Sequence, residues 1–418
     1  MPYFLVEGDV ELVDPGKYPF EKHQLPLQCR SMEGDLAPGF AYTSGNRSLV
    51  MPHGGGWFKA KATGIPSGVS RPILKGGLLT YRLVHALIGS GDVIWGFLSV
   101  DEAKNELYWM IRVKELGLPS TLPVGMGVYR DVHVIELRNR LNLFSYLSRV
   151  GDEELFRDFK ERSYEVDAAC LFSMETTDIR VDELLYALLF PRVERILDYK
   201  ECASYLRWVG SSCGYNLRLH HDQDILHGTI PKPPGVMTNS HLANHLIDEN
   251  STWMTDYHMT SESSDRRLKR IELYCLCHLM IPLPIAQRIA LSRFTEREIP
   301  LRRIFRIDMF SPEPMDWLQI LSMREPLPAP KDQSLRLVKV LIDGIEHGYK
   351  RREVLEVESS LKKRMLRALI LIREKLWEIY GMPQGMQRGA EEVRKIISAR
   401  HIPKSRIEEA VRSLRELL

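Results

Sequence analysis

Two lysines lie on a predicted strand that follows a glycine-rich turn. Glycines occupy positions 54–56, and residues 57–62 have the composition of a strand. Because side chains alternate along a strand, Lys59 and Lys61 share one face. Two lysines in this position can meet a polyphosphate, with Gly55 and Gly56 of the turn lying against the same ligand. The alternative is that this face of the strand is exposed to solvent.

A glutamate on the next helix is the expected partner of one of these lysines. Ser99 and Glu102 form a capping box, so a helix is predicted over residues 99–116, and Gly117 ends it. Glu102 is then occupied by the cap, whereas Glu106 lies one turn further along the same face. A lysine held by a helix glutamate is directed toward nucleotide phosphates in kinases. The alternative is an ordinary exposed ion pair.

Two oxygen donors flank a predicted hairpin in the second half of the chain. Residues 246–247 and 253–254 have the composition of short strands joined by a turn at 248–250. Asn244 therefore lies just before the first strand, and Asp256 lies just after the second. Oxygen donors at the mouth of a hairpin would hold Mg²⁺ against phosphate oxygens, because this hard cation prefers oxygen ligands. Taken singly, each residue is also common in turns and caps.

Composition limits the classes to which the chain can belong. Its 418 residues are 44% hydrophobic and 27% charged, as in globular proteins with a core, and 57 basic against 55 acidic side chains exclude a polycationic nucleic-acid binder. No apolar run approaches the roughly 18 residues of a membrane span, and the first residues lack the basic start of a signal peptide. Six dilute cysteines favour the reducing cytoplasm, with Cys275 and Cys277 expected as core thiols. We expect neither a membrane nor a nucleic-acid partner.

The two halves of the chain differ in pattern. Short apolar runs bounded by glycine predict strands in roughly the first 125 residues, whereas from about Arg149 onward apolar residues recur at helical spacing. Predicted helical segments are residues 181–197, 335–345, 361–380 and 390–418, the last broken at Pro403, and proline-rich loops are expected at 230–234 and 327–330. This order predicts an α+β fold. Its parts are a small β-rich lobe over 1–125, a larger helical lobe with the hairpin over 126–325, and a C-terminal helical extension over 326–418.

Between about residues 50 and 260, several segments in order resemble the selenoprotein O family of protein-kinase-like adenylyltransferases. Residues 61–71, KATGIPSGVSR, are similar to the family's K-G-A-G-x-T-P-x-S-R segment, which selects Lys61 rather than Lys59. Asn105-Glu106 before residues 116–121, LGLPST, resembles the family's R-E-F helix before L-G-I-P-T-T. Residues 138–146 resemble its I-R-x-G-T-F-x-Y-F segment, whose arginine falls on Arg140. His227-Gly228, Asn244 and Thr255-Asp256-Tyr257 resemble its H-G-V-M-N-T-D-N and D-Y-G segments.

The resemblance implies a bilobal, protein-kinase-like fold that binds Mg-ATP between its lobes. Lys61 and Glu106 would form the ion pair of the N-lobe, Arg71 and Arg140 would contact phosphates, and Asn244 and Asp256 would hold Mg²⁺. In this family ATP is thought to lie reversed relative to ordinary kinases, so that AMP passes to a protein hydroxyl. The implied activity is therefore protein adenylylation with ATP and Mg²⁺, with Lys61, Glu106 and Asp256 as the catalytic set.

The chain also departs from the family pattern. Residues 230–235 lengthen the segment between His-Gly and the asparagine, Ala243 replaces the aspartate proposed as base, His258 replaces a glycine, and the C-terminal redox cysteine motif is missing. Asp222, Asp224 and His241 are the alternatives for the base. The cluster of His220, His221, Asp222 and Asp224 has no standard zinc spacing.

Three other functions remain open on the sequence. They are a phosphotransferase acting on a protein or a small molecule, a catalytically inactive ATP-binding pseudokinase, and an unrelated helical protein with a β lobe.

Overall fold

A computed structural model describes residues 10–13, 42–43, 48–53, 55–62, 98–129, 168–232, 235–238, 240–278, 333–380 and 402–418. The described residues form a mixed α+β protein, as predicted, and they divide into two compact units. The first unit holds the residues up to Arg112 and from Thr121 to Thr176; the second holds Val113–Ser120 and the described residues from Thr177 onward.

The first unit contains an antiparallel sheet in the order β1-β6-β7-β4-β3-β2, with β5 also paired to β7. Its strands are β1 Val10–Val13, β2 Tyr42–Thr43, β3 Ser48–His53, β4 Gly56–Lys61, β5 Leu98–Ser99, β6 Leu122–Tyr129 and β7 Ala168–Glu175. β6 runs through residue 125, where the sequence placed the end of the first lobe. The expected helical pattern from Arg149 onward is wrong at β7. As a central strand with mostly buried residues, β7 shows no clear alternation from which a strand could be recognised.

Glycines shape both connections around the lysine strand and its partner helix. Gly55, between the paired residues His53 and Gly56, has a φ of +81°, a left-handed conformation that glycine adopts without steric penalty. Helix α3 spans Val100–Glu115, directly after Ser99, as the capping pattern predicts. It ends at Gly117, whose φ is +71° and whose amide donates to the Lys114 carbonyl.

Helices make up most of the second unit. They are α7 Val181–Tyr186, α8 Tyr199–Asp222, α9 Arg266–His278, α13 Gln333–Arg351, α14 Ser359–Tyr380 and α16 Lys404–Leu417, with 3₁₀ turns η4 Ala187–Leu189, η5 Val193–Arg195 and η6 Leu242–Asn244. The helices predicted near residues 335–345 and 361–380 are α13 and α14. The predicted helix 181–197 is instead α7 followed by two 3₁₀ turns, and α16 begins directly after Pro403. Cys275 and Cys277 are buried in α9, as predicted for core thiols.

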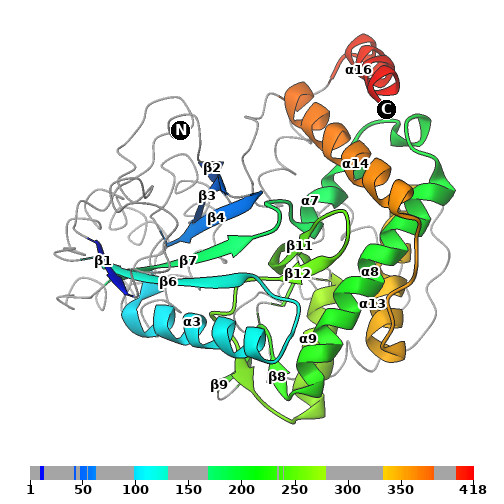
Figure 1. Cartoon of the computed structure of the whole chain (residues 1–418). Helices are drawn as coiled ribbons and strands as arrows, with labels where there is room; N and C mark the ends of the chain where they lie inside the picture. Colours follow the sequence, from blue (N-terminus) through cyan, green and yellow to red (C-terminus); the bar gives the residue numbers. More distant parts are fainter. Residues whose placement is uncertain are drawn as a thin grey trace, which may run out of the picture. The chain divides into compact units, whose positions relative to one another are not determined.

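Helices α8 and α13 lie side by side with their backbones in contact (Figure 1). Gly210 and Gly214 of α8 face α13, and Gly344 and Gly348 of α13 face α8. A Cβ atom added at Gly214 would lie 2.0 Å from the carbonyl oxygen of Ile345. This close approach makes the helix pair the central support of the second unit.

Three small two-stranded antiparallel sheets complete the second unit. β8 Ile225–Leu226 pairs with β13 Ser261–Glu262, β9 Thr229–Lys232 pairs with β10 Gly235–Thr238, and β11 His245–Ile247 pairs with β12 Thr252–Met254. The hairpin predicted at residues 246–254 is therefore confirmed. The loop expected at 230–234 is wrong for residues 230–232, because Pro231 is tolerated in a two-stranded ladder that leaves an edge open. No helix among the described residues has the length and apolar character needed to cross a membrane.

Candidate functional site

The first unit contains the ion pair that the sequence predicts. Lys61 Nζ lies 2.7 Å from both carboxylate oxygens of Glu106, and the two residues are only 5% and 1% exposed. β4 supplies the lysine from the interior of the sheet, and α3 supplies the glutamate. A solvent-exposed ion pair at this position, the alternative left open by the sequence, is therefore wrong.

Lys59 is buried as well, but it has a different partner. Its Nζ lies 2.8 Å from Oε1 of Glu175 on the neighbouring strand β7. Phe58, on the other face of β4, stacks on Phe172 at a ring-centroid distance of 5.7 Å, which fixes the register of the two strands. Lys59 is thus paired within the sheet, and Lys61 is paired to the helix.

The ends of the hairpin β11–β12 bring the two predicted metal ligands onto neighbouring backbone. Asn244 ends η6 and Asp256 follows β12, and the amide of Thr255 donates to the carbonyl of Asn244 at 3.0 Å. Asp256 has a φ of +69°, a left-handed conformation that is uncommon outside glycine. Such strain costs about 1–3 kcal/mol and is concentrated at functional sites. The amide and carboxylate oxygens of these residues are a donor set that fits Mg²⁺.

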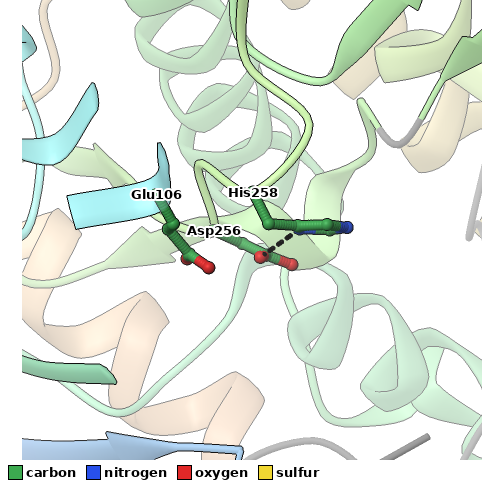
Figure 2. Close-up of side chains that lie close together, drawn as sticks. All are labelled: Glu106, Asp256 and His258. Atoms are coloured by element: carbon green, nitrogen blue, oxygen red, sulfur yellow. Dashed lines mark hydrogen bonds and ion pairs between the residues drawn. The ribbon is translucent and has the colours of Figure 1, made fainter. Parts of the chain in front are cut away.

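His258 contacts the predicted metal aspartate, a role that the sequence did not show. Its Nδ1 lies 2.7 Å from Oδ1 of Asp256, as Figure 2 shows. The sequence marked His258 only as a departure from the family pattern. The available signal in the sequence was that a histidine follows the candidate ligand Asp256 by two residues. In the structure Asp256 has the left-handed conformation, and the side chains of Asp256 and His258 meet.

Helix α8 holds strand β12 in place through side-chain hydrogen bonds. The side-chain amide of Asn216 donates to the carbonyl of Thr252 at 2.7 Å, and the hydroxyls of Ser212 and Thr252 are 2.8 Å apart. All three residues are buried. The hairpin that carries Asp256 is therefore attached to the rigid helix pair α8–α13.

A buried glutamate anchors the His-Gly segment and was missed by the sequence reasoning. Glu272 of α9 accepts hydrogen bonds from the amides of His227 and Gly228 and from Nε2 of His221. Burial alone would raise the pKa of Glu272, but the hydrogen bond and charge of His221 reverse this effect and lower it. Nε2 of His227 in turn lies 2.9 Å from the carbonyl oxygen of Thr255. The anchored segment thereby positions the backbone directly before Asp256.

Helix α7 supports the segment that contains Asn244. Arg180, at its N-terminus, donates a hydrogen bond to the carbonyl of Ala243, the residue before Asn244. Glu183 of α7 is paired with Arg373 of α14. Burial raises the pKa of Glu183 to about 7, although the charge of Arg373 opposes the rise. Helix α14 therefore packs against α7, the helix that supports the segment containing Asn244.

The alternatives for the missing base differ in their surroundings. Asp222 lies 2.8 Å from Nε of Arg218 and from Nη2 of Arg352, and Asp224 is paired with Lys269 at 2.5 Å. His241 is buried, and burial lowers its pKa to about 3 although the charge of Asp256 acts in the opposite direction. Both aspartates are thus held in surface ion pairs.

His220 and His221 do not form a metal cluster with these aspartates. His220 lies 2.8 Å from the carbonyl oxygen of Asn216 and 3.3 Å from the hydroxyl of Tyr257. His221 lies between Tyr349 and Glu272. Each histidine is directed to its own hydrogen-bond partners, which agrees with the absence of a zinc spacing in the sequence.

Of the four remaining predicted site residues, the structure describes two. Arg71 and Arg140 lie outside the described residues. Gly55 is exposed at the β3–β4 turn, and Gly56 is half-buried at the start of β4. The phosphate-contacting roles of all four residues stay predictions.

Comparisons with known proteins found no match to this chain. No family model matches the chain, and neither a curated protein nor a solved structure matches it. The functional interpretation therefore rests on the residues, their geometry and the resemblance of the motifs.

Proposed function

We propose that the protein is an ATP- and Mg²⁺-dependent transferase with a bilobal, kinase-like fold, and that it transfers AMP to a hydroxyl group of a protein. The observation that carries the proposal is the buried pair of Lys61 and Glu106. Burying an ion pair is often no more stabilising than burying apolar side chains of the same size. Burial alone does not distinguish this pair from the buried pair of Lys59 and Glu175. A functional role for Lys61 is supported because its glutamate comes from the helix that follows the strand, which is the arrangement that holds the phosphate lysine in kinases.

The order of the polar residues along the chain supports a nucleotide site. In kinases a strand lysine is held by a glutamate of the next helix, and an asparagine and an aspartate later in the chain hold the metal ions. Lys61, Glu106, Asn244 and Asp256 follow this order, and the last two flank a hairpin whose ends are hydrogen-bonded. Mg²⁺ bound by these oxygens would neutralise charge on the phosphates and orient them.

AMP transfer, rather than phosphate transfer, is proposed because of the motif resemblance over residues 61–71 and 138–146. The acceptor hydroxyl oxygen would form a bond to the α-phosphorus, the bond from this phosphorus to the bridging oxygen would break, and pyrophosphate would leave. The hydroxyl proton would pass to a base or to water. Lys61 would bind phosphate oxygens and stabilise the charge that develops there.

An inactive nucleotide-binding module is the second candidate, and one observation favours it. Ala243 lacks the carboxylate of the family's proposed base, and Asp222 and Asp224 are held in ion pairs. Positioning and charge neutralisation supply much of the rate in such reactions, so a missing base slows the transfer without preventing it. Phosphotransfer from ATP stays the third candidate.

One labelling experiment separates the three candidates. The protein is incubated with Mg²⁺ and ATP that carries the label on either the α- or the γ-phosphate, together with a mixture of protein acceptors. We expect the α-label, and not the γ-label, to become attached to protein, and the Asp256→Asn variant to abolish this transfer. Transfer of the γ-label would indicate a kinase, and ATP-dependent thermal stabilisation without any transfer would indicate the inactive module.

A further inference from the structure

His258 occupies the position where the resembling motif has glycine, and its side chain contacts the proposed metal ligand. Its Nδ1 is 2.7 Å from Oδ1 of Asp256 (Figure 2). The side chains of the two residues are 18% and 20% exposed. Both side chains are therefore partly exposed to solvent.

The other histidines near this segment are closed to solvent. His220, His227, His241 and His245 are buried, with exposures from 0% to 6%. His220 and His227 have ring contacts with Tyr257, which is itself fully buried. Among these five histidines of the described part of the chain, His258 alone combines a carboxylate partner with access to solvent.

The backbone holds the Asp256–His258 pair in place. The carbonyl of Thr255 is bound by His227, and Tyr257 is fixed in the core. Asp256, between them, adopts the left-handed conformation with a φ of +69°. Fixed residues on both sides of Asp256 reduce the entropy lost when a ligand orders the pair.

We infer that Asp256 and His258 together form a mixed oxygen–nitrogen site for a divalent first-row transition metal, and that this site prefers Mn²⁺ to Mg²⁺. Imidazole nitrogen is a common ligand of transition metals, whereas Mg²⁺ favours oxygen ligands and water. Adjacent ligands of an octahedral ion with bonds of about 2.0–2.1 Å lie roughly 2.9 Å apart. The two atoms are 2.7 Å apart, close to this spacing, and a bound ion would replace the proton that they share. The inference deepens the proposed function, on which it rests for the role of Asp256.

Titration calorimetry with Mn²⁺ alone and Mg²⁺ alone, without nucleotide, tests the inference on the full chain. We expect the unmodified protein to bind Mn²⁺ at least about tenfold more tightly than Mg²⁺. His258→Asn keeps a hydrogen-bonding group beside Asp256 but removes the ring nitrogen. Because loss of an outer partner alone costs roughly 10- to 100-fold in metal affinity, loss of a ligand should weaken Mn²⁺ binding by at least about tenfold. Mg²⁺ binding should change little.

A second histidine–carboxylate pair provides the matched control. Nε2 of His347 lies 2.7 Å from Oε1 of Glu353, on an exposed part of the second unit. His347→Asn should leave Mn²⁺ affinity unchanged. If His258→Asn fails to fold, which circular dichroism would show, His258→Ala takes its place.

Equal affinities for the two ions, or unchanged Mn²⁺ affinity in the His258 variants, would overturn the inference. Adding ATP after the metal distinguishes this failure from failure of the proposed function. ATP binding without a preference for Mn²⁺ would contradict the inference alone. A preference for Mn²⁺ that depends on His258, without any ATP binding, would support the metal site and contradict the proposed transferase.

Discussion

At the scale of single residues, Lys59 and Lys61 share a strand face and are both buried, but they differ in their partners. If Lys61 is the phosphate ligand, Lys61→Ala should weaken ATP binding far more than Lys59→Ala. Either change removes the lysine partner of a buried carboxylate and should cost about 3–5 kcal/mol of stability. Equal loss of stability with unequal loss of ATP affinity, measured by calorimetry, is the expected result.

Double variants separate binding from folding more cleanly. Lys61→Met with Glu106→Gln, and Lys59→Met with Glu175→Gln, each remove both charges of a pair and leave no lone buried ion. A hydrogen bond to a charged group contributes about 1.5–3 kcal/mol, so the first variant should bind ATP roughly 10- to 100-fold more weakly. The second should retain the affinity of the unmodified protein. Equal weakening in both would contradict the assignment of Lys61.

Asp256 is the residue on which Mg²⁺-dependent binding should depend. Asp256→Asn suits the left-handed conformation at this position, which asparagine adopts more readily than most residues. We expect the free energy of unfolding to change by less than about 1 kcal/mol. The gain in ATP affinity that Mg²⁺ produces over a chelator should disappear. An unchanged gain, measured by calorimetry, would show that Asp256 does not hold the metal.

Patterns among residues close in the sequence made part of the candidate site predictable. Glu106 was identified because Glu102 belongs to the start of the helix, and Asn244 and Asp256 because short strands lie between them. The partners Glu175 of Lys59 and Glu272 of Gly228 were not predicted, since they lie 116 and 44 positions away in the sequence. Such pairs are set by tertiary packing, which one sequence does not display.

At the scale of elements, the glycines between α8 and α13 should control the stability of the second unit. Gly214→Ala improves helix propensity by about 1 kcal/mol but drives a methyl group into the Ile345 carbonyl. We expect a net loss of about 2 kcal/mol, because a clash with a backbone atom should cost about 3 kcal/mol, the upper end of the usual range for overpacking, and the gain in helix propensity offsets about 1 kcal/mol. Chemical denaturation measures the change. Ser204→Ala, at an exposed position of α8, should have an effect within about 0.5 kcal/mol.

Helices and strands whose apolar residues recur with a clear period were predicted, and those without such a period were not. α13 and α14 were recognised because apolar residues recur at helical spacing. β7 was missed because its residues are mostly buried and show no clear alternation, and β9 because Pro231 indicated a loop. The close contact of α8 with α13 left a trace in the sequence, because Gly210 and Gly214, like Gly344 and Gly348, are four residues apart and so share a helix face. That these two faces meet each other is set by tertiary packing.

At the scale of the whole molecule, acid should destabilise the protein through its buried histidines. Burial lowers the pKa of His220 and His241 to about 3, and it also lowers the pKa values of His227 and His245. As the pH falls below about 6.5, the unfolded chain takes up protons that the folded protein does not, so stability is lost.

Two buried carboxyl groups oppose this trend. Burial raises the pKa of Asp182 to about 6 and that of Glu183 to about 7, so the folded protein holds protons there that the unfolded chain has released. Four histidines act in one direction and two carboxyl groups in the other. The free energy of unfolding should therefore fall as the pH is lowered from 7 to 5, with a slope set by the excess of histidines.

Urea denaturation between pH 7 and pH 5 measures this slope. His220→Asn removes one of these four histidines and should reduce the slope near pH 5 by about 1.4 kcal/mol per pH unit, the contribution of one proton. His347→Asn, at the protein surface, should leave it unchanged. Stability that is constant or rises as the pH falls would contradict the prediction.

The α+β class was predictable at this scale because strand-like and helix-like patterns separate along the chain. The extent of the first unit was not predictable from these patterns. It continues to Thr176, since β7 returns to the centre of a sheet whose other strands come earlier in the sequence. Strand order depends on long-range pairing, and periodicity within a segment carries no information about it.

The proposed function requires that Lys61, Asn244 and Asp256 act on one nucleotide. The test is a crystal structure of the protein with Mg²⁺ and an ATP analogue that has a methylene group between its α- and β-phosphorus atoms. We predict that Lys61 Nζ contacts a phosphate oxygen of the analogue and that oxygens of Asn244 and Asp256 coordinate the metal. An analogue bound away from Lys61, or a metal held by other residues, would contradict the claim.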